Sequence, residues 1–409
     1  MKNKNFVSFF GGSVFSALGD AIFMIAISWY IADVFNSGSL MGLVLLLMGV
    51  CRFIFGLVGG VIADAVGPKI IMVISDLLRG LIITFLCIAL STSYLPIWLL
   101  FIVAVLFGTV DAFYWPAAEA LKPKLVKQAQ FSQANSVYFT TVRMINIFGP
   151  VIGGVLIAAN SYILAMIIVL FSFLFSAVLI SLIKIKLVSD TKDEVPGSSG
   201  WKSFLADLHE GLLFVKNEKI LLTLIVTMFF ANIGANGIMA VLPFLVEEMN
   251  LSADALGGIQ MAMAIGATLV GGILTFKAIK TPSMYYVTAG FLGQGIFFGL
   301  VYWLGSFLMV AGSLFMVGVF TALVGVFIPT IIQTIVPQNL MGRVGSVLMT
   351  VSMASTPLAH FTFGFLTDIY GPKSMFLIAG VTEVSAAVIS LIYLKLSQIP
   401  FVIEREVSQ

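Results

Sequence analysis

The sequence predicts an all-α integral membrane protein, in which twelve transmembrane helices form two parallel six-helix bundles with a central cavity. Three observations carry this prediction: the composition, the number of apolar runs, and a repeat that relates the two halves. The 409 residues are 60% hydrophobic and only 10% charged, whereas soluble domains are about 45–50% apolar and roughly 25% charged. The chain therefore falls in the class of proteins that cross a membrane several times.

The apolar runs are long enough to cross a bilayer, because a helix needs about 20 apolar residues to span about 30 Å of hydrocarbon. Most of the breaks between them are short and carry Gly, Pro, Ser or Asn. The predicted spans are residues 6–35, 39–63, 69–91, 96–120, 132–158, 161–184, 219–246, 253–277, 283–304, 307–335, 344–367 and 374–396.

One long break divides these spans into two groups of six. We expect an N-terminal bundle over residues 1–187, a cytoplasmic linker over 188–217 and a C-terminal bundle over 218–409. The linker begins with a polar stretch and continues as "WKSFLADLHEGLLFVKNEK", where apolar residues recur every three to four positions. This spacing predicts an amphipathic helix that lies along the cytoplasmic face.

The basic residues set the orientation of the chain. If the N-terminus is inside, seventeen Lys and Arg residues fall in inside segments, and the outside segments hold only Lys373. Cytoplasmic loops carry an excess of Lys and Arg. We therefore expect a multi-pass protein of the cell membrane with both termini in the cytoplasm.

The two halves carry matching prolines at an offset of just over 200 residues, about half the chain. The matched pairs are Pro116 with Pro329, Pro123 with Pro337, and Pro150 with Pro357. Six spans is an even number, so the halves are expected to be parallel repeats related by an axis along the membrane normal. This architecture places a substrate cavity between the halves and allows alternating access.

The loop after the second span reads "GGVIADAVGPK". Gly60, Asp64, Gly67 and Lys69 fit the G-x-x-x-D-x-x-G-x-K motif, and the chain resembles the major facilitator superfamily over essentially its whole length. Two positions that are basic in the family motif are not basic here. The resemblance implies that these four residues form a cytoplasmic gating motif; the alternative is a plain tight turn with a lysine on the inside.

Further stretches point to one branch of that family. They are "SDLLRG", "FYWPAAEAL", "QANS", "FGPVIGG", "LADLHEGLLFVKNEK", "GRVGS" and "GFLTDIYGPK". Together they resemble the twelve-helix drug:proton antiporter branch, which includes macrolide efflux proteins and siderophore exporters. The resemblance implies export of hydrophobic drug-like molecules, macrolides among them, and hence a role in multidrug efflux and antibiotic resistance.

Ionisable residues inside the predicted spans are unevenly distributed, and they cost about 2.5–3.5 kcal/mol each at a helix centre unless they are paired, neutralised or used. The N-terminal half holds Asp20, Arg52, Asp76, Arg79, Asp111, Glu119 and Arg143, whereas the C-terminal half holds only Glu383. We place Asp20, Arg52 and Arg143 near the midplane and Asp111 slightly to the cytoplasmic side. We place Asp76 and Arg79 at a shallower level, as an i,i+3 structural ion pair.

Asp20 and Asp111 are the candidate proton-coupling acids, with Arg143 and Arg52 as candidate partners. The family resemblance places the first and fourth spans along the central cavity. A buried carboxylate near an arginine is pulled both ways between the charged and neutral forms. The alternative is that both acids are permanently paired with Arg52 or Arg143 and only hold helices together.

Four residues are candidates for lining a substrate cavity. Phe113 and Trp115 lie beside Pro116, and Asn232 and Asn236 share one face of the seventh span at i,i+4. Packing within and between helices is the alternative role for all four.

No enzyme is expected from this sequence. The histidines are His209 and His360, both cysteines lie in apolar runs, and no phosphate-binding Gly-x-x-x-x-Gly-Lys-Ser/Thr loop is present. We therefore expect no cofactor, no metal and no nucleic-acid partner. The expected partners are protons, a small hydrophobic substrate and the lipid bilayer, and we expect a monomer. The alternatives are an exporter or flippase for a lysophospholipid or a siderophore, and a non-transporting membrane sensor on the same fold.

Overall fold

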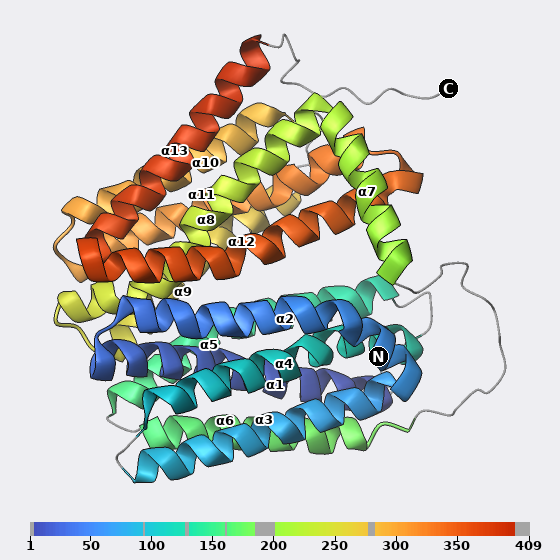
Figure 1. The fold of residues 1–409 in the computed structure, drawn as a ribbon, viewed down its shortest axis with the longest axis vertical. Helices are drawn as coiled ribbons and strands as arrows, with labels where there is room; N and C mark the ends of the chain where they lie inside the picture. The colour runs from blue at the N-terminus through green and yellow to red at the C-terminus, as the bar shows by residue number, and fades with distance from the viewer. Residues whose placement is uncertain are drawn as a thin grey trace. The chain divides into compact units, whose positions relative to one another are not determined.

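The computed structural model describes residues 4–92, 95–126, 131–159, 162–184, 201–276 and 283–396. Helices dominate this part of the chain (Figure 1). Eleven of the described helices are long and apolar enough to cross a membrane. A twelfth long helix, the 30-residue α12 (Met341–Tyr370), is more polar because Ser, Thr and His interrupt its apolar residues. The predicted all-α fold class is confirmed, and the helix bounds fall within a few residues of the predicted spans.

Contacts divide the chain into two compact units. The first comprises Met1–Asn36, Leu43–Pro196 and Ser252–Gly257, and the second comprises Ser37–Gly42, Gly197–Leu251 and Gly258–Gln409. The first part of the expected linker, residues 188–200, lies outside the described residues, and the rest is the helix Trp201–Asn217.

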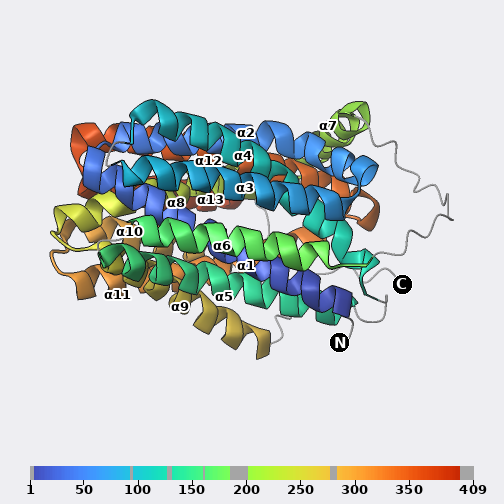
Figure 2. The same cartoon turned by 90° about the horizontal axis from the view of Figure 1, so that it is seen from below.

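The helices that make up most of the first unit precede residue 185. They are α1 (Lys4–Tyr30), α2 (Gly38–Val66), α3 (Pro68–Ser91), α4 (Ile97–Leu121), α5 (Phe131–Ala158) and α6 (Tyr162–Ser181). A π-helical turn, Ile31–Phe35, extends α1. Helix α1 packs against both α5 and α6, and α6 also packs against α3 (Figure 2). This arrangement brings α1, α3 and α6 together, and α4 packs against α3 and contacts α1 and α6 through the ring of Phe107.

The loop between α2 and α3 has the geometry that its sequence predicts. Gly67 has a φ of 103°, which a residue with a Cβ rarely adopts. Pro68 then starts α3 at the first helical position, where its missing N–H costs nothing. Lys69 donates a hydrogen bond of 2.7 Å from Nζ to the backbone oxygen of Ile183. The turn therefore ties the start of α3 to the residues just after α6.

The helices that make up most of the second unit begin after residue 200. They are α7 (Trp201–Asn217), α8 (Lys219–Glu248), α9 (Ala253–Phe276), α10 (Met284–Leu300), α11 (Phe307–Ile335), α12 and α13 (Pro372–Leu396). The predicted amphipathic helix is present as α7. It packs against α12 and α8, and Glu210 forms an ion pair with Arg343 of α12.

A second turn of the same design joins α12 to α13. Gly371 has a φ of 78°, and Pro372 starts α13. Asp368, in the last turn of α12, accepts hydrogen bonds from the backbone N–H groups of Gly38 (2.5 Å) and Ser39 (2.9 Å), which belong to the same unit. A carboxylate at this place satisfies N–H groups that a helix start leaves without partners.

Two glycines set the distance between α9 and α11. A Cβ added to Gly318 would overlap the backbone oxygen of Met263, and one added to Gly266 would overlap that of Phe315. Small residues allow helix backbones to approach closely in membranes. The crossing therefore leaves no space for any larger side chain.

Gly318→Val is expected to destabilise the second unit by about 1–3 kcal/mol, the usual range for overpacking. The reason is that the obstructing atoms belong to the backbone and cannot rotate away. Thermal unfolding in detergent measures the effect. Gly312→Val is the control on the same helix, because a Cβ there meets nothing within 4 Å. Equal stability of the two variants would contradict the close crossing.

Candidate functional site

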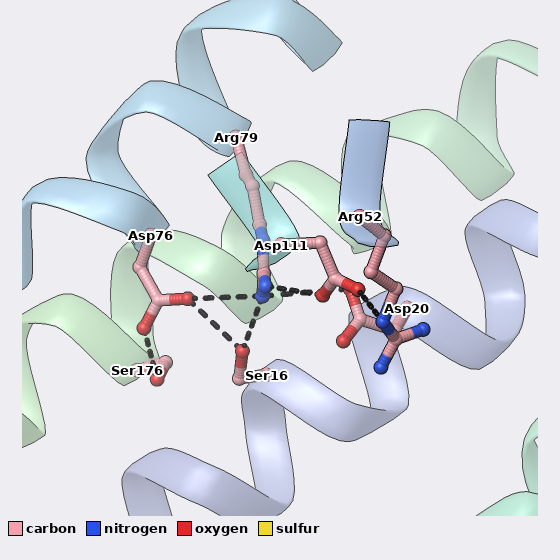
Figure 3. Close-up of polar contacts among 7 residues, drawn as sticks. All are labelled: Ser16, Asp20, Arg52, Asp76, Arg79, Asp111 and Ser176. Atoms are coloured by element: carbon pink, nitrogen blue, oxygen red, sulfur yellow. Dashed lines mark hydrogen bonds and ion pairs between the residues drawn. The ribbon is translucent and has the colours of Figure 1, made fainter. Parts of the chain in front are cut away.

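Five ionisable side chains from four helices of the first unit form one buried cluster, which Figure 3 draws with two serines. Asp20 comes from α1, Arg52 from α2, Asp76 and Arg79 from α3, and Asp111 from α4. Residues three or four positions apart share a helix face. Asp76 and Arg79 therefore project from the same side of α3.

Arg79 is the centre of the cluster. Its side chain is 0% exposed, and its Nη2 donates to Oδ1 of Asp111 at 2.6 Å. Its Nη1 lies 3.5 Å from Oδ1 of Asp20 and 3.6 Å from Oδ1 of Asp76. One guanidinium thus faces three carboxylates, as its planar fork of donors permits.

Aromatic rings enclose the same guanidinium. Its central carbon lies 4.6 Å from the ring centroid of Tyr114, 5.4 Å from that of Phe173 and 5.6 Å from that of Phe107. A cation over an aromatic face is attracted by the ring quadrupole, most strongly where water is excluded. The rings therefore favour the charged form of Arg79 in an apolar interior.

Asp76 is held by hydrogen bonds as well as by charge. Ser16 Oγ donates to its Oδ1 at 2.9 Å, and Ser176 Oγ donates to its Oδ2 at 2.6 Å. Arg79 Nη1 in turn donates to Ser16 Oγ at 3.0 Å. Both carboxylate oxygens of Asp76 thus accept hydrogen bonds, which offset the cost of burying this acid.

Asp111 bridges the two arginines. Its Oδ1 takes the bond from Arg79, and its Oδ2 lies 3.1 Å from Nε of Arg52. The Arg52 side chain is 53% exposed, whereas that of Asp111 is 9% exposed. Arg52 therefore joins the buried cluster to the accessible surface of α2.

Asp20 differs from the other two acids. Its Oδ1 is buried and has no hydrogen-bond partner among the described residues. Its contact with Arg79 is an ion pair at 3.5 Å, which is longer than a hydrogen bond of this type. At 20%, its side chain is also the most exposed of the three carboxylates.

The predicted separation of Asp76 and Arg79 from the other charges needs correction. Arg79 lies at ion-pair distance from both Asp20 and Asp111, so the five charges form one group. The predicted span 69–91 and α3 (Pro68–Ser91) have almost the same bounds and put Arg79 at mid-helix, so the shallower placement was wrong, and the packing of α1 and α4 around α3 brings the other acids to it. The i,i+3 contact is present, but at 3.6 Å it is the longest of the three.

The other predicted gating and proton-coupling residues are described only in part. Gly60 and Asp64 fall in α2 and Arg143 falls in α5, at positions whose side chains lie outside the described part of the chain. Gly67 and Lys69 form the turn described above.

The four predicted cavity residues belong to different units. Phe113 and Trp115 are half-buried in the first unit, where Phe113 contacts the ring of Phe55 and Trp115 that of Tyr114. In the second unit, Asn236 donates a 2.9 Å hydrogen bond to the backbone oxygen of Asn232 within α8. This asparagine thus has its amide bonded to its own helix.

Sequence reasoning did not find Ser16, Ser176 or Tyr114. A signal for Ser16 is present, because it stands four residues before Asp20 and so shares its helix face. Ser176 and Tyr114 carry no such signal, since serines and tyrosines are common in the spans and only packing brings these two to the cluster.

Many long apolar helices, with a buried and nearly balanced group of charges among those of the first unit, define a polytopic membrane protein of the all-α class. Comparison with known proteins identifies the family within this class. A model of the Major Facilitator Superfamily matches residues 9–360. The chain belongs to this superfamily.

Relatives of known or suggested role include transporters and exporters. The chain is 25% identical over 407 residues to the uncharacterized MFS-type transporter YvqJ of Bacillus subtilis, covering 97% of this chain and 93% of the relative. It is 20% identical to macrolide efflux protein A of Streptococcus pyogenes over 94% of each chain. It is 25% identical to the enterobactin exporter EntS of Salmonella typhi, over 83% of this chain and 80% of the exporter.

Solved structures agree on the fold. The nucleoside transporter NupG superposes with a TM-score of 0.73 at 13% identity, covering 97% of this chain and all of the other. The superfamily and these neighbours are transporters and not enzymes. The chain is therefore a superfamily transporter with exporters among its relatives.

Proposed function

We propose that this chain exports hydrophobic drug-like small molecules, of the macrolide kind, by proton antiport through alternating access. The observation that carries the proposal is the charge balance of the buried cluster. Asp20, Asp76 and Asp111 contribute three negative charges against the two positive charges of Arg52 and Arg79. One bound proton makes the cluster neutral, and its loss leaves a net charge of −1 inside the bundle.

We assign that proton to Asp20. Asp76 accepts two serine hydroxyls, and Asp111 is bonded to both arginines. Asp20 has an oxygen without a hydrogen-bond partner and the greater exposure. A net charge buried in the membrane is costly, so binding and release of one proton would change which conformation is favoured.

The energy source follows from this assignment. Each proton that moves inward gains about 2.3 kcal/mol per 100 mV of membrane potential. Coupling inward proton movement to outward movement of a cargo requires that the protonated and deprotonated clusters favour different conformations. We propose that Arg52 and Arg143 are the charged partners through which protonation changes the favoured conformation. Asp111 transmits the effect of protonation, because it contacts both Arg52 and Arg79.

The remaining assignments are part of the same proposal. Gly60, Asp64, Gly67 and Lys69 form the cytoplasmic gating motif, supported by the turn at Gly67 and the bond from Lys69. The cavity lining includes Phe113, Trp115, Asn232 and Asn236. The protein is a monomer of the cell membrane with both termini in the cytoplasm, supported by the distribution of basic residues.

Export of a siderophore is the second candidate function, and the relation to the enterobactin exporter supports it. A siderophore carries metal-chelating polar groups and is more polar than a macrolide-like drug or a lipophilic dye. Competition between cargoes in one assay distinguishes the two.

Proton-driven flux in proteoliposomes tests the proposal. The purified chain is reconstituted, a pH gradient is imposed, and movement of a lipophilic dye and of a macrolide is followed. We expect accumulation of at least one cargo against its gradient, which a protonophore abolishes because it removes the driving force. If neither cargo moves with the gradient imposed, drug export is contradicted, and a siderophore and a lysophospholipid become the cargoes to assay.

A further inference from the structure

Glu383 is a buried acid that the charge cluster does not use. It lies in α13, in the second unit, and is 0% exposed. Neither of its carboxylate oxygens has a hydrogen-bond partner among the described residues. An ionised carboxylate in such a place would bear the full cost of desolvation.

No cation compensates this carboxyl within the described helices that pack against α13. Those helices are α8, α10 and α12, together with the short turn Val301–Trp303. Their ionisable residues are Lys219, Glu247, Glu248, Tyr285, Tyr286, Tyr302, Arg343, His360, Asp368 and Tyr370, and α13 itself adds Lys373, Tyr393 and Lys395. All of these except His360 lie within about two turns of a helix end, whereas Glu383 lies near the middle of α13. No ion pair to Glu383 is formed by any of them in the described structure.

Glycines on both neighbouring helices close around the same carboxyl. A Cβ on Gly234 of α8 would lie 3.2 Å from Oε1 of Glu383 and 3.3 Å from the backbone oxygen of Ala379. A Cβ on Gly295 of α10 would lie 3.0 Å from Cβ of Glu383. The carboxyl is thus enclosed by close-packed helix backbones and has no hydrogen-bond partner among the described residues, which favours its uncharged, protonated form.

Hydroxyl groups continue from this point along the interface of α8 and α13. Ser390 lies seven residues after Glu383, and Thr227 lies seven residues before Gly234, which is about two turns along each helix. Both belong to the otherwise mostly apolar lining of a hollow of about 280 Å³ between the two helices, where the Thr227 hydroxyl donates to the backbone oxygen of Thr223. The interface is therefore less tightly packed beyond Glu383, toward the end of α13 that the basic residues place in the cytoplasm.

We propose that Glu383 is a second proton-binding carboxyl, protonated in the conformation described here. It gives up its proton to cytoplasmic water when α8 and α13 separate at the hollow, and it takes a proton from water on the outer side of the membrane before they close again, so that each cycle carries one proton inward. The site is independent of the Asp20 cluster in geometry, because all of its contacts lie within the second unit. The claim that its proton is transported rests on the proposed function, whereas the claim that it is protonated does not.

Infrared spectroscopy of the reconstituted full chain tests protonation directly. At neutral pH, wild type should show the carbonyl stretch of a protonated carboxyl, and Glu383→Gln should lack that band. Glu248→Gln is the matched control, because that glutamate is exposed and lies 3.4 Å from Lys373. Asp20→Asn identifies any band from the charge cluster.

Identical carboxyl bands in wild type and Glu383→Gln would show that Glu383 is ionised, and would overturn the proposal. If the glutamine variant does not fold, Glu383→Asp keeps the acid and should shift the band rather than remove it. An unshifted band in the aspartate variant would also overturn it.

Transport of the Glu383 proton is tested by the ratio of cargo concentrations across the membrane at which net flux stops. With a gradient of one pH unit and no membrane potential, one proton fewer per cargo lowers that ratio tenfold. We expect this tenfold fall in Glu383→Gln but not in Glu248→Gln. An unchanged concentration ratio in Glu383→Gln would refute transport of this proton. Absence of proton-driven flux in wild type would refute the proposed function, and the infrared result would still decide whether Glu383 is protonated.

Discussion

Arg79→Met is expected to lower the free energy of unfolding of the first unit by about 3–5 kcal/mol, the range for removing one partner of a buried ion pair. Three carboxylates face this guanidinium, and the nearest of them lies at 2.6 Å. Without it, Asp20 and Asp76 lose the basic partner that the structure gives them, and Asp111 keeps only Arg52. Thermal unfolding in detergent and the yield of folded protein measure the loss.

The destabilisation should depend on pH with a definite sign. In the variant, the native state can relieve repulsion among the carboxylates only by binding protons. Where the native state binds more protons than the unfolded chain, stability falls as the pH rises. Arg79→Met should therefore be closest to wild type at acid pH and should lose stability toward neutral pH.

Arg52→Met is the matched control for that experiment. Arg52 contacts Asp111 alone in the cluster and is 53% exposed, and pairs with such exposure contribute about 0–1 kcal/mol. We expect its unfolding temperature to stay near that of wild type. If Arg79→Met were as stable as Arg52→Met, Arg79 would not be the centre that holds the three acids together.

Asp20→Asn is expected to remove the proton that is coupled through the charge cluster, so that uphill transport falls sharply while cargo still equilibrates across the membrane. Asparagine keeps the shape of the side chain but cannot bind and release a proton, and it fixes the cluster at two negative and two positive charges. The cluster then stays in the electrically neutral form at every pH. In proteoliposomes, the limiting accumulation of cargo should fall about tenfold per unit of the pH gradient, the contribution of one proton, and downhill flux should lose the pH dependence that the cluster supplies.

Asp33→Asn is the control for the coupling experiment. Asp33 belongs to the π-helical turn that extends α1, is exposed, and accepts a 2.6 Å hydrogen bond from Tyr162. Its replacement removes an acid from the same span but leaves the cluster intact, so accumulation should persist. Full pumping by Asp20→Asn would mean that Asp20 is structural, and Asp111 would become the residue to replace.

Much of this protein is determined by sequence alone, for a physical reason. Hydrocarbon requires long apolar helices with internal hydrogen bonds, so length and hydropathy give the spans directly. The turns at Gly67 and Gly371 were equally legible, because a glycine with positive φ followed by proline at a helix start is a local property. The cost of placing a charge in the membrane likewise singled out Asp20, Asp111 and Glu383 as residues that must be paired, neutralised or functional.

The tertiary structure decided which of these groups meet. Hydropathy gives depth to within a turn or two but says nothing of the direction in which a side chain points across the bundle. Placing Arg79 beside Asp20 and Asp111 required the packing of α1, α3 and α4, as did the choice of Ser16 and Ser176 for Asp76. The sequence by itself determined that the membrane interior holds acids. The helix packing determined that Asp20 and Glu383 are the acids whose oxygens have no hydrogen-bond partner in the described structure. The physical reason is that hydrogen-bond partners in a helix bundle come from distant segments of the chain.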